Sequence, residues 1–354
     1  MENSVISPPR LRLHVVFGSG GTKTLLAGAG AVLAFDVGGI DQLETIGAAS
    51  GGSFIASILA RKLPPKRFLP EMIDTDFAKL LAPRVCALSR LLALLNKFRH
   101  EQSRPRRGVY SVKALRHKVN ALVPTWPERL WIVASGNNNS QILFTWKGVY
   151  RCSQSQQVEL ISSRPPAVGL AVTASCGIPG ILDSTKYRGE LLFDGALSGD
   201  GDVPVDVIPR HFGQQEDSLT IAMDTGEDPI KKQRWLRALW HLFSGSWNEP
   251  PIDGIHPKPR PGLLLLTPNV TGFHPLQWKI KRDLKWKAIV SGFVATANAI
   301  CDHNLASNDE QSGLRRFVAA FERLAPQVGD SYCESIEQFL RSEGLLEADR
   351  GGQS

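Results

Sequence analysis

The sequence predicts an α/β protein: a three-layer α/β/α sandwich with a mostly helical C-terminal part. Strand and helix signals alternate through the first 205 residues, which is typical of a sheet covered by helices. The apolar run Leu263–Leu266 predicts a further buried strand. Helical patterns dominate from Lys285 to Leu346 and account for the rest of the chain.

The first predicted strand covers residues 11–17. A glycine-rich loop at 18–24 and a helix of small and apolar residues at 25–35 follow it. Such a loop exposes backbone N–H groups at the positive end of the helix dipole, where they can hold an anion. The anion is a phosphate or the oxyanion formed when a serine attacks an ester. A nucleotide P-loop fits poorly, because Phe17 and Thr22 occupy its two required glycine positions. An oxyanion hole and a glycine turn without a ligand both stay open.

A second turn of small residues, at 45–53, lies between an apolar run and a helix-like segment. Ser50 is at its centre, in a sequence that matches the G-x-S-x-G nucleophile elbow except that Ala48 replaces the first glycine. Such a turn projects the serine hydroxyl to where a substrate can reach it. Small residues that pack a helix against a sheet produce the same pattern, so this turn alone does not establish a nucleophile.

Two further segments lie before residue 205. Residues 171–180 predict a helix of small residues broken by Pro179, and the apolar run at 190–193 predicts a short strand that ends at Asp194. An Asp-Gly pair after a strand is usually an ordinary turn or cap. Asp194 therefore gains its significance from the segments that precede it.

In this order, the motifs resemble those of the patatin-like phospholipases. The pattern of that family is a strand, a G-G-G-x-[RK] loop, a G-x-S-x-G elbow, an A-S-x-A-x-P helix end and a D-G-[GA] turn. This chain has Ser19-Gly20-Gly21-Thr22-Lys23, the Ser50 elbow, Ala174-Ser175-Cys176-Gly177-Ile178-Pro179 and Asp194-Gly195-Ala196. Smaller likenesses are Gly108-Val109-Tyr110 and the strand-like run Trp131-Ile132-Val133-Ala134-Ser135. The resemblance extends from about residue 11 to residue 205.

The chain departs from the family pattern at four places. Ser19 replaces the first glycine of the loop, and Ala48 replaces the first glycine of the elbow. One extra residue lies between Lys23 and Val32, and the stretch 197–205 after the D-G turn is longer than in the family. These changes leave the serine, the basic loop residue and the aspartate in place.

The resemblance implies a lipid acyl hydrolase with a Ser–Asp dyad, water as second substrate and no metal or organic cofactor. Ser50 would be the nucleophile and Asp194 the general base. Backbone N–H groups of the oxyanion hole would come from Ser19, Gly20, Gly21 and Gly51. Lys23 would position the loop or meet the lipid phosphate, unless it is a solvated surface lysine.

Because Ser50 and Asp194 must meet in one site, we expect the chain between them to fold with them. We therefore expect one catalytic domain over residues 11–346, with the core motifs in 11–205 and a C-terminal extension in 206–346. Disorder is expected at 1–10 and 347–354.

A Ser-His-Asp triad is the nearest alternative for an enzyme, and residue order leaves it open. The histidines that follow Asp194 are His211, His241, His256, His274 and His303. The sequence contains no C-x-x-C and no H-E-x-x-H, so we expect no zinc site.

The formal net charge of +7 favours anionic partners such as lipid headgroups, nucleic acid or an acidic protein. Interleaved tryptophans and basic residues are typical of a membrane interface. The predicted membrane-binding residues are Trp278, Lys279, Lys281, Arg282 and Trp286. A solvated helix face is the alternative. A basic loop at 99–107 and an amphipathic helix at 235–243 are also predicted. No nucleic-acid module is recognisable, so we expect no nucleic-acid partner.

Five scattered cysteines form no disulfide framework and favour a reducing compartment. No secretory signal is evident, and no apolar run approaches the 18 or more residues of a membrane span. We expect a cytoplasmic protein that acts peripherally at a membrane, and the sequence leaves export as an effector open.

The leading hypothesis is therefore hydrolysis of fatty-acyl esters in phospholipids or lysophospholipids. The Ser19 and Ala48 departures motivate a second hypothesis, a catalytically weak lipid- or protein-binding module. A third is nucleotide binding at the glycine loop. Because an unrestrained phospholipase endangers its host, a regulatory partner or small-molecule activator is expected. The sequence leaves the oligomeric state undetermined.

Overall fold

The computed structural model describes residues 11–81, 108–136, 140–153, 157–179, 181–213, 217–225, 257–270, 272 and 277–347. Several predictions concern segments outside this set. They are the disordered segment 1–10, all but residue 347 of the tail 347–354, the basic loop 99–107 and the amphipathic helix 235–243.

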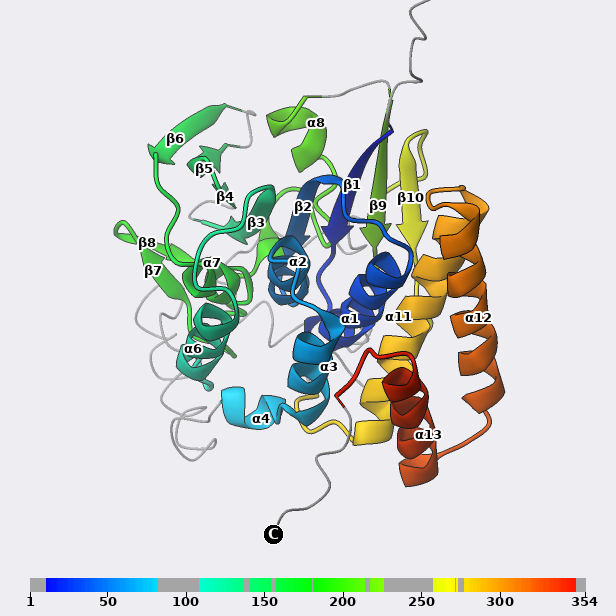
Figure 1. The fold of residues 1–354 in the computed structure, drawn as a ribbon. Helices are drawn as coiled ribbons and strands as arrows, with labels where there is room; N and C mark the ends of the chain where they lie inside the picture. The colour runs from blue at the N-terminus through cyan, green and yellow to red at the C-terminus, as the bar shows by residue number, and fades with distance from the viewer. Residues whose placement is uncertain are drawn as a thin grey trace, which may run out of the picture.

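A mixed sheet forms the centre of the described structure (Figure 1). Its strand order is β10 (Leu263–Leu266), β9 (Ser218–Met223), β1 (Arg12–Phe17), β2 (Leu43–Ala49), β3 (Leu130–Ser135), β4 (Gln141–Thr145), β5 (Gly148–Cys152) and β6 (Val158–Ser162). Pairing is parallel from β10 to β3 and antiparallel from β3 to β6. Every residue of β3 is buried, as expected for a strand covered on both faces. A separate hairpin joins β7 (Thr185–Tyr187) to β8 (Glu190–Leu192).

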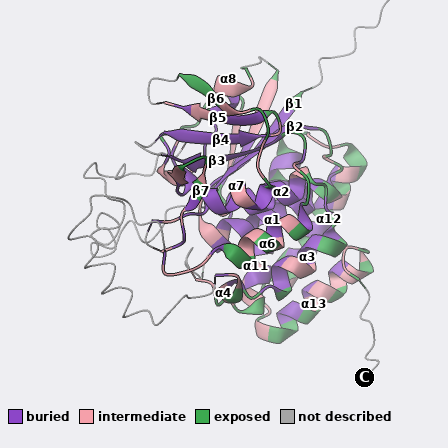
Figure 2. Ribbon diagram, turned by 90° about the vertical axis from the view of Figure 1, so that its left-hand side faces the viewer, coloured by how far each residue is buried: buried purple, intermediate pink, exposed green. Residues whose placement is uncertain are grey.

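Most described helices lie on one face of the sheet (Figures 1 and 2). They are α1 (Gly21–Val37), α2 (Gly52–Ala60), α3 (Pro65–Asp74), α4 (Phe77–Leu80), α6 (Lys113–Leu122), α7 (Val168–Ser175), α11 (Arg282–Asp302), α12 (Asn308–Leu324) and α13 (Gly329–Ser342). Figure 2 shows buried residues concentrated on α1 and α2, and exposed residues on outer helices such as α13. The predicted helical C-terminal part is confirmed by α11 to α13.

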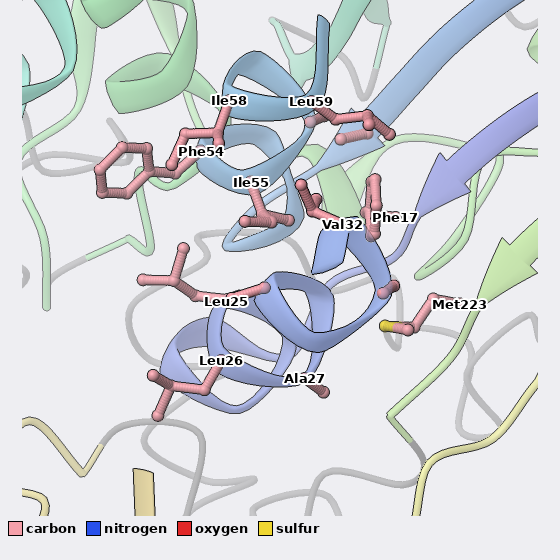
Figure 3. Packing of buried hydrophobic residues seen from close by; sticks show 14 of the residues in the cluster. Phe17, Leu25, Leu26, Ala27, Val32, Phe54, Ile55, Ile58, Leu59 and Met223 are labelled. Atoms are coloured by element: carbon pink, nitrogen blue, oxygen red, sulfur yellow. The ribbon is translucent and has the colours of Figure 1, made fainter. Parts of the chain in front are cut away.

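The predicted helix at 25–35 starts earlier than expected, because α1 already begins at Gly21. The glycine loop is therefore only Gly18 to Gly20, and Lys23 belongs to the first turn of the helix. Figure 3 shows Ile55 of α2 lying between α2 and α1. The two helices that follow the predicted catalytic turns thus pack against each other directly.

Helix α1 also packs closely against α11 from the C-terminal part. A Cβ atom at Gly30 would lie 1.8 Å from the carbonyl oxygen of Ile289, and one at Gly292 would lie 1.8 Å from that of Ala27. Only glycine leaves room for backbones this close. The helix after the glycine loop is therefore held from behind by the C-terminal helices.

The second face of the sheet has a smaller cover. Trp131, Val133 and Leu143 of the sheet are buried beneath Val203 and beneath Val207 of the short helix α8 (Val207–His211). The segment between Asp194 and α8 therefore forms part of the third layer. The predicted α/β/α sandwich is confirmed, with layers of unequal size.

Within the described residues, every helix is too short or too polar to cross a bilayer.

Candidate active site

Ser50 lies in a tight turn between β2 and α2, with a left-handed backbone conformation (φ 50°). A non-glycine residue in this conformation is strained by about 1–3 kcal/mol, and such strain is frequent at functional sites. The turn is held by Ser53, whose backbone N–H and hydroxyl both donate to the Ser50 carbonyl at 2.9 and 2.5 Å. A Cβ atom at Gly52 would lie 2.5 Å from the Gly18 carbonyl oxygen, so the second glycine of the elbow is sterically required. The backbone here has the shape of a nucleophile elbow.

Asp194 lies beside this turn, although 144 residues separate it from Ser50. The Ser50 hydroxyl donates to Asp194 Oδ2 at 2.7 Å, while Oδ1 accepts the backbone N–H of Ala196 at 2.9 Å. The Asp194 N–H in turn donates to the Gly177 carbonyl at 2.9 Å. Ser50 and Asp194 are only 6% and 4% exposed, so the pair is shielded from bulk water. One carboxylate oxygen is held in place and the other accepts from the serine.

Ser175 supports the elbow from α7 and was not predicted as a site residue. Its hydroxyl accepts the Ser50 N–H at 2.8 Å and donates to the Val133 carbonyl at 2.5 Å. One buried hydroxyl thus joins the serine turn to the central strand β3. The signal for it was the small-residue helix end at 171–180, which the resemblance had already singled out.

The glycine loop lies against the elbow. A Cβ atom at Gly51 would lie 2.2 Å from the Gly21 carbonyl oxygen, and Gly20 and Gly21 have φ values of 136° and 59°. Among the described residues, no acceptor is hydrogen-bonded to the backbone N–H groups of Gly20, Gly21 or Gly51. These three predicted oxyanion-hole residues are thus brought together next to Ser50.

The oxyanion-hole prediction for Ser19 is wrong. Its backbone N–H donates to the Asp202 carbonyl at 2.7 Å, so that donor is already used. Its hydroxyl donates to Asp202 Oδ1 at 2.8 Å. Ser19 therefore anchors the loop, and its N–H and hydroxyl donate to Asp202 instead of to an oxyanion. Asp202, like Ser175, supports the site through hydrogen bonds and was not predicted from the sequence.

Lys23 lies half-buried in the first turn of α1, and its backbone N–H donates to the Gly20 carbonyl at 3.2 Å. It is thus attached to the loop it was predicted to support. The role of its ammonium group stays a prediction.

The histidine alternative has no support among the described residues. His211 Nε2 lies 3.1 Å from Cys152 Sγ, and His303 is exposed at the end of α11. His241, His256 and His274 lie outside the described residues. Among the described residues, Asp194 provides the side chain that is hydrogen-bonded to the Ser50 hydroxyl.

The membrane-binding prediction is wrong for Trp286. This side chain is 1% exposed, and its Nε1 donates to Glu337 Oε1 at 2.9 Å, because it lies on the inner face of α11. Trp278 is half-buried with its ring edge-on to Tyr110, the ring centroids 4.3 Å apart. Arg282 is exposed but forms ion pairs with Asp74 and with Glu337. For Trp278 and for the exposed Lys279 and Lys281, membrane contact stays a prediction.

The part of the chain that the structure describes contains no group of three or more His, Cys, Asp or Glu side chains able to hold a metal ion.

A family model described as "Patatin-like phospholipase" matches residues 15–207. No curated protein matches the chain. Among solved structures, VipD from Legionella pneumophila is similar with a TM-score of 0.40 and 13% identity, over 98% of this chain and 82% of that one. Human GIVD cytosolic phospholipase A2 is similar with a TM-score of 0.44 and 14% identity, over 87% of this chain and 60% of the human one.

Proposed function

The chain belongs to the patatin-like phospholipase family and is a lipid acyl hydrolase, and from this premise we propose that it cleaves fatty-acyl esters of phospholipids or lysophospholipids through an acyl-enzyme on Ser50. The observation that carries the proposal is the 2.7 Å hydrogen bond from the Ser50 hydroxyl to Asp194 Oδ2. It joins a hydroxyl on a strained elbow to a buried carboxylate, which is what a nucleophile and its base require.

In the first half-reaction, Asp194 Oδ2 accepts the proton of Ser50 as the serine oxygen attacks the ester carbonyl carbon. The resulting tetrahedral oxyanion collapses and breaks the bond to the alcohol. The leaving alkoxide takes the proton from Asp194, and the fatty acid remains as an ester on Ser50. Water then attacks this ester as Asp194 accepts a proton from it. Collapse releases the fatty acid, and the proton returns to Ser50.

The oxyanion would be held by the N–H groups of Gly20 and Gly21 at the start of α1 and of Gly51 at the start of α2. Loss of one such donor typically lowers the rate about 10²–10³-fold. The second oxygen of Asp194 accepts the Ala196 N–H at 2.9 Å, which would hold the carboxylate in place as Oδ2 exchanges the proton. Lys23, in the first turn of α1, would meet the phosphate of the bound lipid.

We further propose that residues 11–346 act as one catalytic domain at a membrane surface, in the cytoplasm or after export as an effector. Trp278, Lys279 and Lys281 are the residues proposed for lipid contact, and a regulatory partner or small-molecule activator would control the activity. Replacing Trp278 should weaken sedimentation with anionic vesicles while hydrolysis of a soluble ester stays intact. Unchanged sedimentation would show that Trp278 does not contact the membrane.

The test of the proposed function is the release of free fatty acid from mixed phospholipid vesicles by the wild type, Ser50→Ala and Asp194→Ala. Cys152→Ser is the matched control, because it removes a different buried nucleophile. We expect release by the wild type and the control, and loss in both dyad variants with circular dichroism unchanged.

Two other results would redirect the assignment. No release by the wild type, even with cell extract as a source of activator, would favour a lipid-binding module, and Ser50→Ala should then retain vesicle binding. Activity that survives Asp194→Ala but not Ser50→Ala would favour a histidine-based triad.

A further inference from the structure

We propose that Asp202 is a positioning residue for acyl hydrolysis. By binding Ser19, it holds the glycine loop, Gly18 to Gly20, in its position relative to Ser50. The inference rests on the proposed function and deepens it. Asp202 belongs to the segment 197–205 that follows the D-G turn, which we call the strap. The strap connects the turn carrying Asp194 to helix α8.

The strap binds the loop through two hydrogen bonds to a single residue. The Ser19 N–H donates to the Asp202 carbonyl at 2.7 Å, and the Ser19 hydroxyl donates to Asp202 Oδ1 at 2.8 Å. Contact continues at the neighbouring position, because a Cβ atom at Gly18 would lie 2.7 Å from Val203 Cγ2. The N–H and the hydroxyl of Ser19 thus both bind the strap, while its carbonyl accepts from the Thr24 hydroxyl at 2.7 Å. The next N–H groups, of Gly20 and Gly21, are the ones proposed to bind the oxyanion.

The sequence departs from the family's motif pattern at this contact. Where that pattern has a glycine, which would have no hydroxyl to donate, this chain has Ser19. A part-buried hydroxyl needs an acceptor, and the strap supplies a carboxylate. The Ser19 hydroxyl and the Asp202 carboxylate therefore satisfy each other in one contact.

The strap itself is anchored at its middle. Asp200 is paired with Arg210 of α8 at 2.6 Å and accepts a hydrogen bond from Gln141 of β4. One anchored segment thus follows directly after the turn that carries the base and holds the glycine loop through Asp202. Loosening the Asp202 contact would shift Gly20 and Gly21 relative to Ser50, and a displacement of about 1 Å in a catalytic site can cost 10²-fold in rate.

The test is steady-state hydrolysis of a soluble short-chain ester by the wild type, Ser19→Ala, Asp202→Ala and the double variant. Asp202→Asn keeps an oxygen acceptor and is the conservative variant. Asp206→Ala is the matched control, since it removes a carboxylate that pairs with Arg260 on the surface, four residues further along. We expect Ser19→Ala and Asp202→Ala each to lower kcat roughly tenfold with KM unchanged, and the double variant to lose no more than either single one. Asp202→Asn should lose about threefold, and the control should match the wild type.

Additive losses, a change in KM alone, or full activity in Asp202→Ala would overturn the inference while leaving the proposed function intact, since the wild type would still turn over. A wild type without any esterase activity would overturn both. Should Asp202→Ala fail to fold, Ser19→Ala compared with Ser19→Gly tests the same contact, and both should show the same loss of kcat.

Discussion

Within the described part of the chain, two candidate pairs of a nucleophilic atom and a base can be compared. Ser50 Oγ lies 2.7 Å from Asp194 Oδ2, and Cys152 Sγ lies 3.1 Å from His211 Nε2. Both involve a largely buried nucleophile, and both join residues far apart in the sequence. By proximity alone, the second pair would be as good a candidate as the first.

The backbone separates the two pairs. Ser50 is in a strained turn that packs against the glycine loop, whose N–H groups are the proposed donors for an oxyanion. Cys152 is the last residue of β5, paired regularly with Gln141 of β4 and Val158 of β6. A residue in a regular strand has its N–H and carbonyl groups committed to the ladder, so it gathers no donors for an oxyanion.

The charge state separates them as well. Burial raises the pKa of the Cys152 thiol to about 11. Burial, helped by the Arg210 charge, lowers the pKa of His211, so the imidazole stays neutral. A neutral thiol beside a neutral imidazole is a structural contact, since the thiolate is the reactive form. The difference teaches that a reactive pair needs a strained turn and donors for the developing charge, besides a short distance.

The largest expected effect is on kcat, and it distinguishes Asp194 from His211 as the catalytic base. Asp194→Asn should lower kcat for a soluble ester by roughly 10²–10⁴-fold, because the amide cannot accept the serine proton. His211→Gln, which removes the other base, should leave kcat within about twofold of the wild type. Steady-state kinetics of both variants at pH 7.5 test this. An equal loss in both variants would break the comparison.

A smaller loss is expected from crowding the donors around Ser50. Gly51→Ala should lower kcat on the order of 10²-fold, because the new methyl group would push the Gly21 carbonyl away from the elbow. Gly199→Ala is a matched control in the strap, where nothing lies within 4 Å of the added Cβ atom. Kinetics and circular dichroism of the two variants check the prediction, and equal rates in both would contradict it.

The buried thiols should make stability sensitive to alkali. Burial raises the pKa of Cys176 to about 12 and that of Cys152 to about 11, so the unfolded chain loses these protons first. The stability they contribute is complete below about pH 9 and falls at higher pH, by up to about 1.4 kcal/mol per pH unit for each thiol. Urea unfolding between pH 8.5 and 10.5 should show a shallower decline for Cys176→Ser and for Cys152→Ser than for the wild type. If stability declined with pH equally in the wild type and the variants, the folded state would not raise the pKa values of these thiols.

The smallest effect lies on the acid side. Because the pKa of folded His211 is below its ordinary value of 6.5, the unfolded chain binds a proton that the folded chain does not. The stability that results is complete above pH 6.5 and is lost as the pH falls below it. His211→Gln should therefore lose less stability than the wild type between pH 7 and 5.5 in urea unfolding. A steeper loss in the variant would contradict the assignment of a neutral imidazole.

Short-range patterns were enough to predict much of the fold and of the site. The turns around Ser50 and Asp194 depend on small residues next to strands, and their order in the chain identified the family. The strand Leu263–Leu266 was found from a run of apolar residues alone.

The features that could not be predicted depend on contacts between residues that are far apart in the sequence. Whether the Ser19 N–H is available is decided by Asp202, 183 residues later. The interleaved tryptophans and lysines after residue 277 read as a surface, but one face of α11 is buried. Even Lys285 on that face is buried, with its ammonium donating to the Ile73 and Thr75 carbonyls at 2.6 and 2.7 Å.

The central claim is that Ser50, activated by Asp194, is the nucleophile of this chain. The most direct test is to incubate the wild type with an alkyl fluorophosphonate, which phosphonylates activated serines, and to locate the adduct by peptide mass spectrometry. The account predicts one adduct, on Ser50, and a strongly slowed reaction in Asp194→Asn. An unmodified Ser50 in folded protein, or an adduct on another residue such as Cys152, would contradict it.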